Sequence, residues 1–175
     1  GPAHMSQRLQ QWTAGQLACG RDFSVFYAPY VNSYRRYMAG TFAPTRLVAG
    51  VDNRTCGLRL IGHSPKAIRV ENRCPGADAN PYLAFAATIA AGIYGITHGL
   101  KFEGIYTGDA YRDPKVREVP KSLYEAVRLL EDSTIAREAF GDVVVDHYVN
   151  TARQEQIVYD RRVTDVDLMR NFERA

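Results

Sequence analysis

The chain has 175 residues, of which 46% are hydrophobic and 23% are charged. These values are ordinary for globular proteins and exclude a disordered, collagen-like or coiled-coil chain, and the length fits one domain or a large piece of one. Three scattered cysteines (Cys19, Cys56 and Cys74) make no disulfide framework, which favours a reducing compartment and predicts a cytoplasmic protein. The most apolar stretch, residues 82–96, falls short of the roughly 20 residues of a membrane span, so we expect no membrane partner.

The formal net charge of +3 is unevenly distributed. Residues 35–73 hold eight basic and two acidic side chains, a net +6, and the remainder of the chain nets −3. Seven of the eight cations are arginines, whose planar side chains bind phosphate and carboxylate groups through paired hydrogen bonds. A nucleic-acid surface usually mixes lysine with arginine among exposed aromatic residues. We therefore interpret this window as a pocket for small anions and expect no nucleic-acid partner.

The predicted elements begin after residues 1–5, whose sequence GPAHM is typical of a cloning scar; residues 6–175 read as one undivided unit. Residues 7–19 have the apolar spacing of an amphipathic helix. Short runs with strand-like composition follow, separated by turn residues. The predicted strands are residues 45–51, 55–60 and 67–72.

The second half of the chain is predicted to be helical. Asn80-Pro81 opens a helix over residues 82–97 that is apolar on every side and is therefore expected to be buried on most sides. Ser122 and Glu125 have the spacing of a capping box. The helix that they open is predicted to bury Leu123, Ala126, Val127 and Leu130.

A last helix is expected over residues 143–163, followed by a tail to residue 175 that docks on the domain. Strands followed by helices predict an α+β fold in which antiparallel strands pack with helices.

The first candidate for chemistry is Arg69-x-Glu71-x-Arg73. On a strand this spacing places one carboxylate about 7 Å from each flanking arginine on the same face. The cations would keep the carboxylate ionised, which suits a ligand of Mg²⁺. The alternative is a solvated ladder of ion pairs on a sheet face. Arg54 and Arg59 add two cations nearby, and such a cluster is costly unless an anion binds there.

Two further segments are candidate parts of the anion pocket. Residues 75–82 form a tight loop before a capped helix, for which a structural role is favoured over anion binding. Twin arginines at 35–36 precede a loop bounded by Gly40 and Pro44, and we interpret this loop as a flap over a substrate. Motifs for zinc, a serine nucleophile, a P-loop or a dinucleotide do not occur in the sequence.

Several segments together resemble the C-terminal part of the catalytic domain of the glutamine synthetase family. They are NSYRR (residues 32–36), DNRTCGLRL (52–60), SPKAIRVENRCPGADANPYLA (64–84) and DHYVNTARQE (146–155). The resemblance implies an ATP-dependent ligase: the γ-carboxylate of L-glutamate attacks the γ-phosphate of ATP, and an amine or ammonia then captures the γ-glutamyl phosphate. It also implies Mg²⁺ or Mn²⁺ as the metal, and a homo-oligomeric double ring with active sites between subunits.

The same resemblance assigns roles within the predicted anion pocket. It places Arg36 and Arg73 at the substrate carboxylates, and Arg54 and Arg73 at the transferring phosphoryl group or acyl phosphate. The remaining roles are ATP binding by Arg59, Lys66 and Arg69, and metal binding by Glu71.

The chain departs from the family pattern at Phe42. Ammonia-using members carry a glutamate at this flap position, which closes the site and takes a proton from ammonium; phenylalanine does neither. An apolar flap residue suits a larger substrate, so we expect an organic amine as acceptor, of the polyamine or ethanolamine type. Ammonia, as in a true glutamine synthetase, is the alternative, and a non-catalytic structural or regulatory relative is a third possibility.

Segments that the family carries before this part, including its N-terminal β-grasp domain, are absent from the sequence. We therefore expect a fragment of a longer protein that is inactive by itself. Tyr111 falls near a loop where some bacterial members are adenylylated, but its surroundings match poorly, and an ordinary loop tyrosine is expected.

Overall fold

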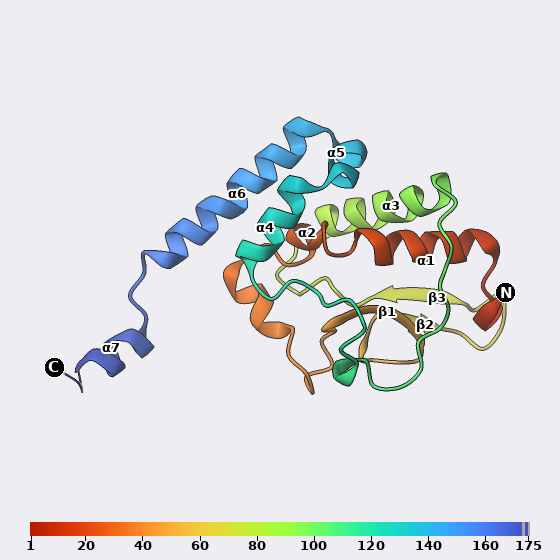
Figure 1. The fold of residues 1–175 in the computed structure, drawn as a ribbon, viewed down its shortest axis with the longest axis horizontal. Helices are drawn as coiled ribbons and strands as arrows, with labels where there is room; N and C mark the ends of the chain where they lie inside the picture. Colours follow the sequence, from red (N-terminus) through yellow and green to blue (C-terminus); the bar gives the residue numbers. More distant parts are fainter. Residues whose placement is uncertain (173, 175) are drawn as a thin grey trace.

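A computed structural model describes residues 1–172 and 174 and has an α+β fold in which a small mixed sheet packs with helices (Figure 1). The strands are β1 (Arg46–Val51), β2 (Cys56–Ile61) and β3 (Arg69–Asn72). The α-helices are α1 (Gln7–Cys19), α2 (Ser24–Tyr27), α3 (Pro81–Thr97), α4 (Leu123–Asp132), α5 (Thr134–Phe140), α6 (Asp142–Asp160) and α7 (Asp165–Phe172). Short 3-10 helices cover Pro2–His4, Val31–Arg36 and Ala110–Arg112.

The sheet corrects the prediction that all strands are antiparallel. Its order is β1-β2-β3, with β2 and β3 antiparallel but β1 and β2 parallel. A link as short as residues 52–55 normally closes a hairpin, because parallel strands usually need a longer crossover. Here Asp52 takes a positive φ of 48° and its N–H donates to the carbonyl of Leu60. The link, residues 52–55, therefore runs back along the sheet, so that β2 starts beside the start of β1 and runs parallel to it.

A long loop covers the outer edge of β1. The N–H of Tyr106 donates to the carbonyl of Ala49, and the N–H of Leu47 donates to the carbonyl of Arg117, each at 2.8 Å. Asn53 in the turned-back link donates its side-chain amide to the carbonyl of Gly108 at 2.8 Å. The residues expected to form a long polar excursion therefore satisfy the β1 edge and hold the link in place.

Helices α1 and α3 lie side by side over the sheet (Figure 1). Both were predicted within one residue of their bounds. They approach closely through glycine: a Cβ atom on Gly15 would stand 2.0 Å from the carbonyl oxygen of Ala91, and one on Gly95 would stand 2.1 Å from that of Gln11. The small residues of α3 thus serve backbone-to-backbone packing on one face of the helix.

The expectation that α3 is buried on most sides is wrong. An outward stripe of large apolar side chains is exposed on this helix in the described chain: Tyr82, Phe85, Ile89 and Ile93. Composition alone did not distinguish the two faces, because the exposed face is as apolar as the buried one.

Helices α4 and α6 pack together, and α4 also packs on α2. The four residues predicted to be buried on α4 are all buried, and Ser122 Oγ accepts the N–H of Glu125 as a cap. On α6 the buried side chains are Val145, Val149 and Ala152. The helix predicted over residues 143–163 is thus present as α6, although it ends at Asp160 and a further helix, α7, follows it in the segment predicted as a tail.

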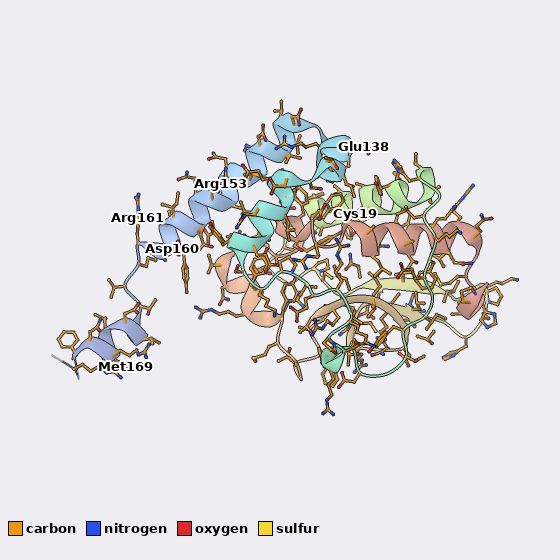
Figure 2. The ribbon with its side chains drawn as sticks, viewed as in Figure 1. Cys19, Glu138, Arg153, Asp160, Arg161 and Met169 are labelled. Atoms are coloured by element: carbon orange, nitrogen blue, oxygen red, sulfur yellow. The ribbon has the colours of Figure 1, made fainter. Side chains whose placement is uncertain are left out.

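The expectation of a docked tail is wrong for the described residues. Helix α7 extends away from the body of the molecule, and Met169 on it is exposed (Figures 1 and 2). The prediction for residues 173 and 175 lies outside the described part of the chain.

The core has two clusters. One lies between the helices, and the smaller one joins Met5 to Ala49, Leu58 and Leu60 of the sheet, with Leu9 and Leu17 of α1 packed against it. Met5 is 1% exposed, so it takes part in the fold although residues 1–5 were set apart as a cloning scar. In the described part of the chain, no helix combines the length and the apolar character needed to cross a membrane.

Candidate active site

A single carboxylate bracketed by two arginines forms the centre of the candidate site. The register of β2 and β3 places Arg59 opposite Glu71. Arg59 Nη1 lies 3.0 Å from Glu71 Oε2, and Arg73 Nη1 lies 2.6 Å from Glu71 Oε1. The side chains of Arg59 and Arg73 are 19% and 14% exposed, and that of Glu71 is 37% exposed. The three side chains therefore form a half-buried ion cluster on one face of the sheet.

The predicted partner set of this carboxylate is partly wrong. Arg73 is its partner as expected, but Arg69 is not. Arg69 starts β3, is exposed, and directs Nη1 only toward the carbonyl of Ala67 at 3.5 Å. Arg59 is the second partner of Glu71, because cross-strand neighbours lie closer together than residues two apart on one strand.

Asp52, in the link between β1 and β2, is a further member of this cluster. Arg59 donates from Nε to Asp52 Oδ1 at 2.9 Å, and its Nη2 contacts the same oxygen. The hydrogen bonds and charge of Arg59 lower the pKa of Asp52. The parallel pairing of β1 with β2 brings the two together, and no signal in the sequence indicated that pairing.

The flap, residues 40–44, lies against the cluster. The carbonyl of Phe42 accepts a hydrogen bond from Arg73 Nη2 at 2.6 Å, and Phe42 has a φ of 59°. The Phe42 side chain is 60% exposed, and Arg54 places its guanidinium carbon 6.0 Å from the ring centroid. The structure thus brings together the flap residue and two of the arginines that the sequence singled out.

Arg36 contacts the backbone of the two residues that follow β3. Its Nη1 donates to the carbonyl of Arg73 at 3.4 Å, its Nη2 contacts the carbonyl of Cys74, and its guanidinium carbon stacks 4.8 Å from the ring of Tyr37. Burial raises the pKa of Cys74 to about 12. The thiol beside Arg36 therefore stays protonated at neutral pH and is a poor nucleophile.

Lys66 and Arg69 lie apart from this group, in the turn before β3 and at its first residue, and both are exposed. Arg69 precedes Arg73 by four residues, which is about 13 Å along a strand. The structure therefore gathers Arg36, Arg54, Arg59, Glu71, Arg73 and Phe42, and leaves the other two predicted residues at the rim.

The cluster is suited to an anion with several oxygens. Arg59 pairs with Asp52 and Glu71, and Arg73 pairs with Glu71. In the described chain no carboxylate pairs with Arg54, whose guanidinium lies beside Phe42. Forked donors that converge in this way match phosphate geometry. A complete metal centre is not present: residues 1–172 and 174 contain no group of three potential ligands, and both Glu71 oxygens are engaged by arginines. Glu71 would need ligands from outside these residues to hold a divalent cation.

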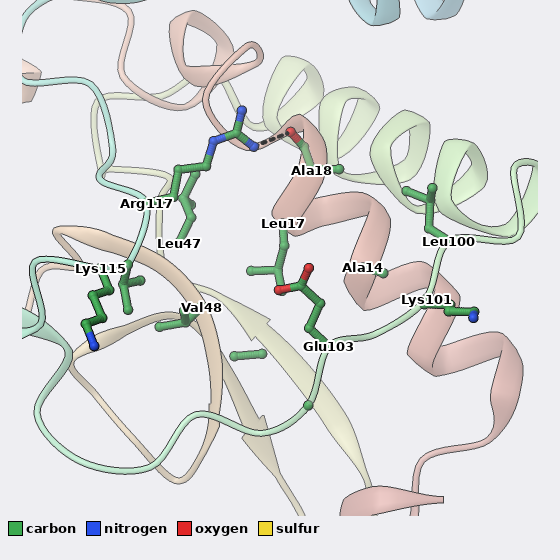
Figure 3. Close-up of a pocket in the computed structure, with 13 residues that line it drawn as sticks. Ala14, Leu17, Ala18, Leu47, Val48, Leu100, Lys101, Glu103, Lys115 and Arg117 are labelled. Atoms are coloured by element: carbon green, nitrogen blue, oxygen red, sulfur yellow. Dashed lines mark hydrogen bonds between the residues drawn. The ribbon is translucent and has the colours of Figure 1, made fainter.

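A separate cavity of about 540 Å³ lies between α1, β1 and the loop 100–117 (Figure 3). It is lined by apolar side chains such as those of Leu17 and Leu47 and by charged residues such as Lys101 and Glu103, and Glu103 directs its carboxylate toward Leu17. None of the predicted site residues lines it. The arginine cluster is therefore an open surface site distinct from this cavity.

Comparison with known proteins gives a consistent result. A family model described as glutamine synthetase, catalytic domain, matches residues 1–171. Gamma-glutamylethanolamide synthetase GlnA4 of Streptomyces coelicolor is 49% identical over 170 residues, which cover 97% of this chain and 36% of that protein. Glutamate–isopropylamine ligase of a Pseudomonas species is 40% identical over 149 residues, which cover 84% of this chain and 32% of that protein.

Similarity extends to a glutamine synthetase and to solved structures. Type-1 glutamine synthetase 2 of Dictyostelium discoideum is 40% identical over 176 residues, covering 98% of this chain and 34% of that protein. The solved structure titled "Apo GmaS without ligand" superposes with a TM-score of 0.85 at 27% identity, covering 98% of this chain and 40% of that one. The chain thus spans about a third of the length of these curated relatives.

Proposed function

This chain belongs to the glutamine synthetase family, and on that premise we propose that it forms part of an ATP-dependent ligase that joins an organic amine to the γ-carboxylate of L-glutamate. In the first step a γ-carboxylate oxygen attacks the γ-phosphorus of ATP and ADP leaves. In the second step the amine nitrogen attacks the acyl carbon of γ-glutamyl phosphate, and phosphate leaves as the nitrogen loses a proton.

The observation that carries this proposal is the pairing of Arg59 and Arg73 with Glu71. The flap residue Phe42 contacts Arg73 through its carbonyl and lies beside Arg54 through its ring. Phosphoryl transfer depends on positioning and on stabilising charge at the transferred group. In this proposal Arg54 and Arg73 contact the transferring phosphoryl group and the acyl phosphate. Arg59 exchanges its carboxylate partners for the phosphates of ATP, because both partners are partly exposed and the ion pairs are easily rearranged.

The rim residues and Arg36 complete the proposed assignment. Lys66 and Arg69 are free to reach the nucleotide from the turn before β3, and Arg36 meets the glutamate carboxylate. The family uses ATP with a divalent metal, and Glu71 supplies one oxygen ligand for Mg²⁺ or Mn²⁺ together with ligands from outside this chain. When bound, the metal neutralises phosphate charge.

Phe42 supports an organic amine as the acceptor. Its exposed ring lies beside Arg54, where it offers an apolar contact and no carboxylate. Two of the relatives have names that specify ligation of ethanolamine and isopropylamine. Ammonia remains the alternative acceptor, since other relatives are named glutamine synthetases. A non-catalytic role is disfavoured, because a site without a ligand gains nothing from three arginines gathered around the flap and Glu71.

The proposal extends to the surroundings of the enzyme. We place it in the cytoplasm as a homo-oligomeric double ring in which part of each active site comes from another subunit. Neither nucleic acid nor membrane is proposed as a partner.

An amine screen on the full-length protein that contains this chain tests the acceptor. Phosphate release with glutamate and ATP is measured with ammonium, ethanolamine, isopropylamine and a polyamine, and an organic amine should give the highest kcat/KM. Phe42→Glu should shift the ratio of kcat/KM values toward ammonium by about tenfold. Met38→Glu is the matched control, because it adds the same charge at another exposed apolar residue next to the flap. Highest turnover with ammonium in the unchanged protein would refute the assignment of an organic amine.

A further inference from the structure

The flap has two contacts that tie it to distant parts of the chain. Arg73 donates to the carbonyl of Phe42 at 2.6 Å, and the hydroxyl of Tyr111 donates to the carbonyl of Ala43 at 2.9 Å. A local hydrogen bond from Thr41 Oγ1 to the carbonyl of Met38 completes the loop. One of these tethers belongs to the arginine cluster, which must rearrange when anions bind. Tyr111 is the tether that can remain throughout.

The flap conformation requires a tether. Phe42 has a φ of 59°, in the left-handed region that a side chain with a Cβ adopts only when its surroundings hold it there. Its ring is 60% exposed and provides little burial to compensate. Hydrogen bonds to the carbonyls of Phe42 and of the next residue fix the two peptide planes that follow this strained position.

Tyr111 is itself held by the link that carries Arg54. The N–H of Ala110 donates to Thr55 Oγ1 at 3.0 Å, and the side chain of Asn53 donates to the carbonyl of Gly108 at 2.8 Å. Residues 53 and 55 flank Arg54 on both sides. Tyr111 thus connects the link that carries Arg54 with the flap that carries Phe42. The guanidinium carbon of Arg54 lies 6.0 Å from the centroid of the Phe42 ring.

The phenol of Tyr111 is suited to this task. It is half-buried, and burial raises its pKa, so at neutral pH it remains protonated and can donate. The other tyrosine on the same loop, Tyr106, points elsewhere: its hydroxyl donates to Asp113 Oδ2 at 3.2 Å. The flap contact is therefore specific to Tyr111.

From this geometry we infer that Tyr111 is a positioning residue for the acceptor amine, which holds the flap so that Phe42 stands over the site beside Arg54. This inference rests on the proposed function. Loss of the hydroxyl releases the Ala43 carbonyl and lets the flap move, while the contacts proposed for ATP and glutamate stay in place. Water then competes with the amine for γ-glutamyl phosphate.

The test compares Tyr111→Phe with Tyr106→Phe in the full-length protein, each change removing one hydroxyl. Tyr111→Phe should raise the KM for the best amine about three- to tenfold and raise the phosphate released per amide formed, with the KM values for ATP and glutamate within twofold. Tyr106→Phe should change none of these. Equal effects of the two variants, or a rise in the ATP and glutamate KM values as large as that for the amine, would overturn the inference.

Two further measurements separate this inference from the proposed function. Hydrogen exchange of the flap amides should be faster in Tyr111→Phe than in Tyr106→Phe, and this readout needs no activity. An unchanged exchange rate in Tyr111→Phe overturns the positioning role, even if the enzyme ligates amines. A faster exchange rate in a protein that shows no amine-dependent turnover overturns the proposed function and the catalytic consequence. In a Phe42→Ala background, Tyr111→Phe should no longer alter the amine KM; a full effect there would mean that it does not act through Phe42.

Discussion

The crossing of α1 and α3 permits a sharp test of the packing. At Gly95 the two backbones are so close that an added Cβ would lie 2.1 Å from the carbonyl oxygen of Gln11 and 2.7 Å from the backbone of Gly15. Carbon and oxygen atoms normally stay well over 3 Å apart, so Gly95→Ala must push the helices apart by about 1 Å. Because both neighbours are backbone atoms, no side chain can move aside to relieve the clash.

The size of the effect follows from two opposing contributions. Overpacking of this kind costs ~3 kcal/mol, the upper end of the usual range, and the better helix propensity of alanine returns ~1 kcal/mol. The net loss of ~2 kcal/mol should lower the melting temperature by about 4–8 °C in a chain of this size. Thermal unfolding followed by circular dichroism measures it.

The control for this substitution is Thr97→Ala, an exposed position at the end of the same helix. It adds helix propensity without a clash and should leave the melting temperature unchanged or slightly higher. A melting temperature for Gly95→Ala at or above that of the unchanged protein would mean that α1 and α3 are not in backbone contact.

Two other predictions concern the site and the core. In the full-length protein, Glu71→Ala should abolish turnover, because Arg59 and Arg73 lose their shared partner and the proposed metal loses a ligand; full activity over a magnesium titration would exclude Glu71 as a metal ligand. Burial raises the pKa from the ordinary 9.0 to about 11 for Cys56 and about 12 for Cys19 and Cys74. The folded state then holds protons that the unfolded state releases, so stability should fall from about pH 9 through pH 12. A melting temperature that stays flat over this range would contradict the burial of the thiols.

Local patterns predicted the elements well because they depend on nearby residues. Asn80-Pro81 opens α3 and Ser122 caps α4. The side-chain oxygens of Asn80 and Ser122 accept hydrogen bonds from N–H groups in the first turn of each helix. The apolar spacing of α4 also identified its buried face, since its polar and apolar residues are segregated around the helix. For α3 the same reasoning failed, because a helix that is apolar all round contains no such contrast.

The motifs by themselves identified a member of the glutamine synthetase family, and the charge distribution predicted an arginine-rich anion site in it. Only the tertiary structure decided which arginine meets which partner, because ion pairs depend on strand register and not on spacing within one strand. The parallel pairing of β1 and β2 places Asp52 next to Arg59. The antiparallel register of β2 and β3 makes Arg59, and not the predicted Arg69, the second ion-pair partner of Glu71. The contact of Tyr111 with the flap joins residues 68 positions apart, a separation at which sequence patterns carry no information.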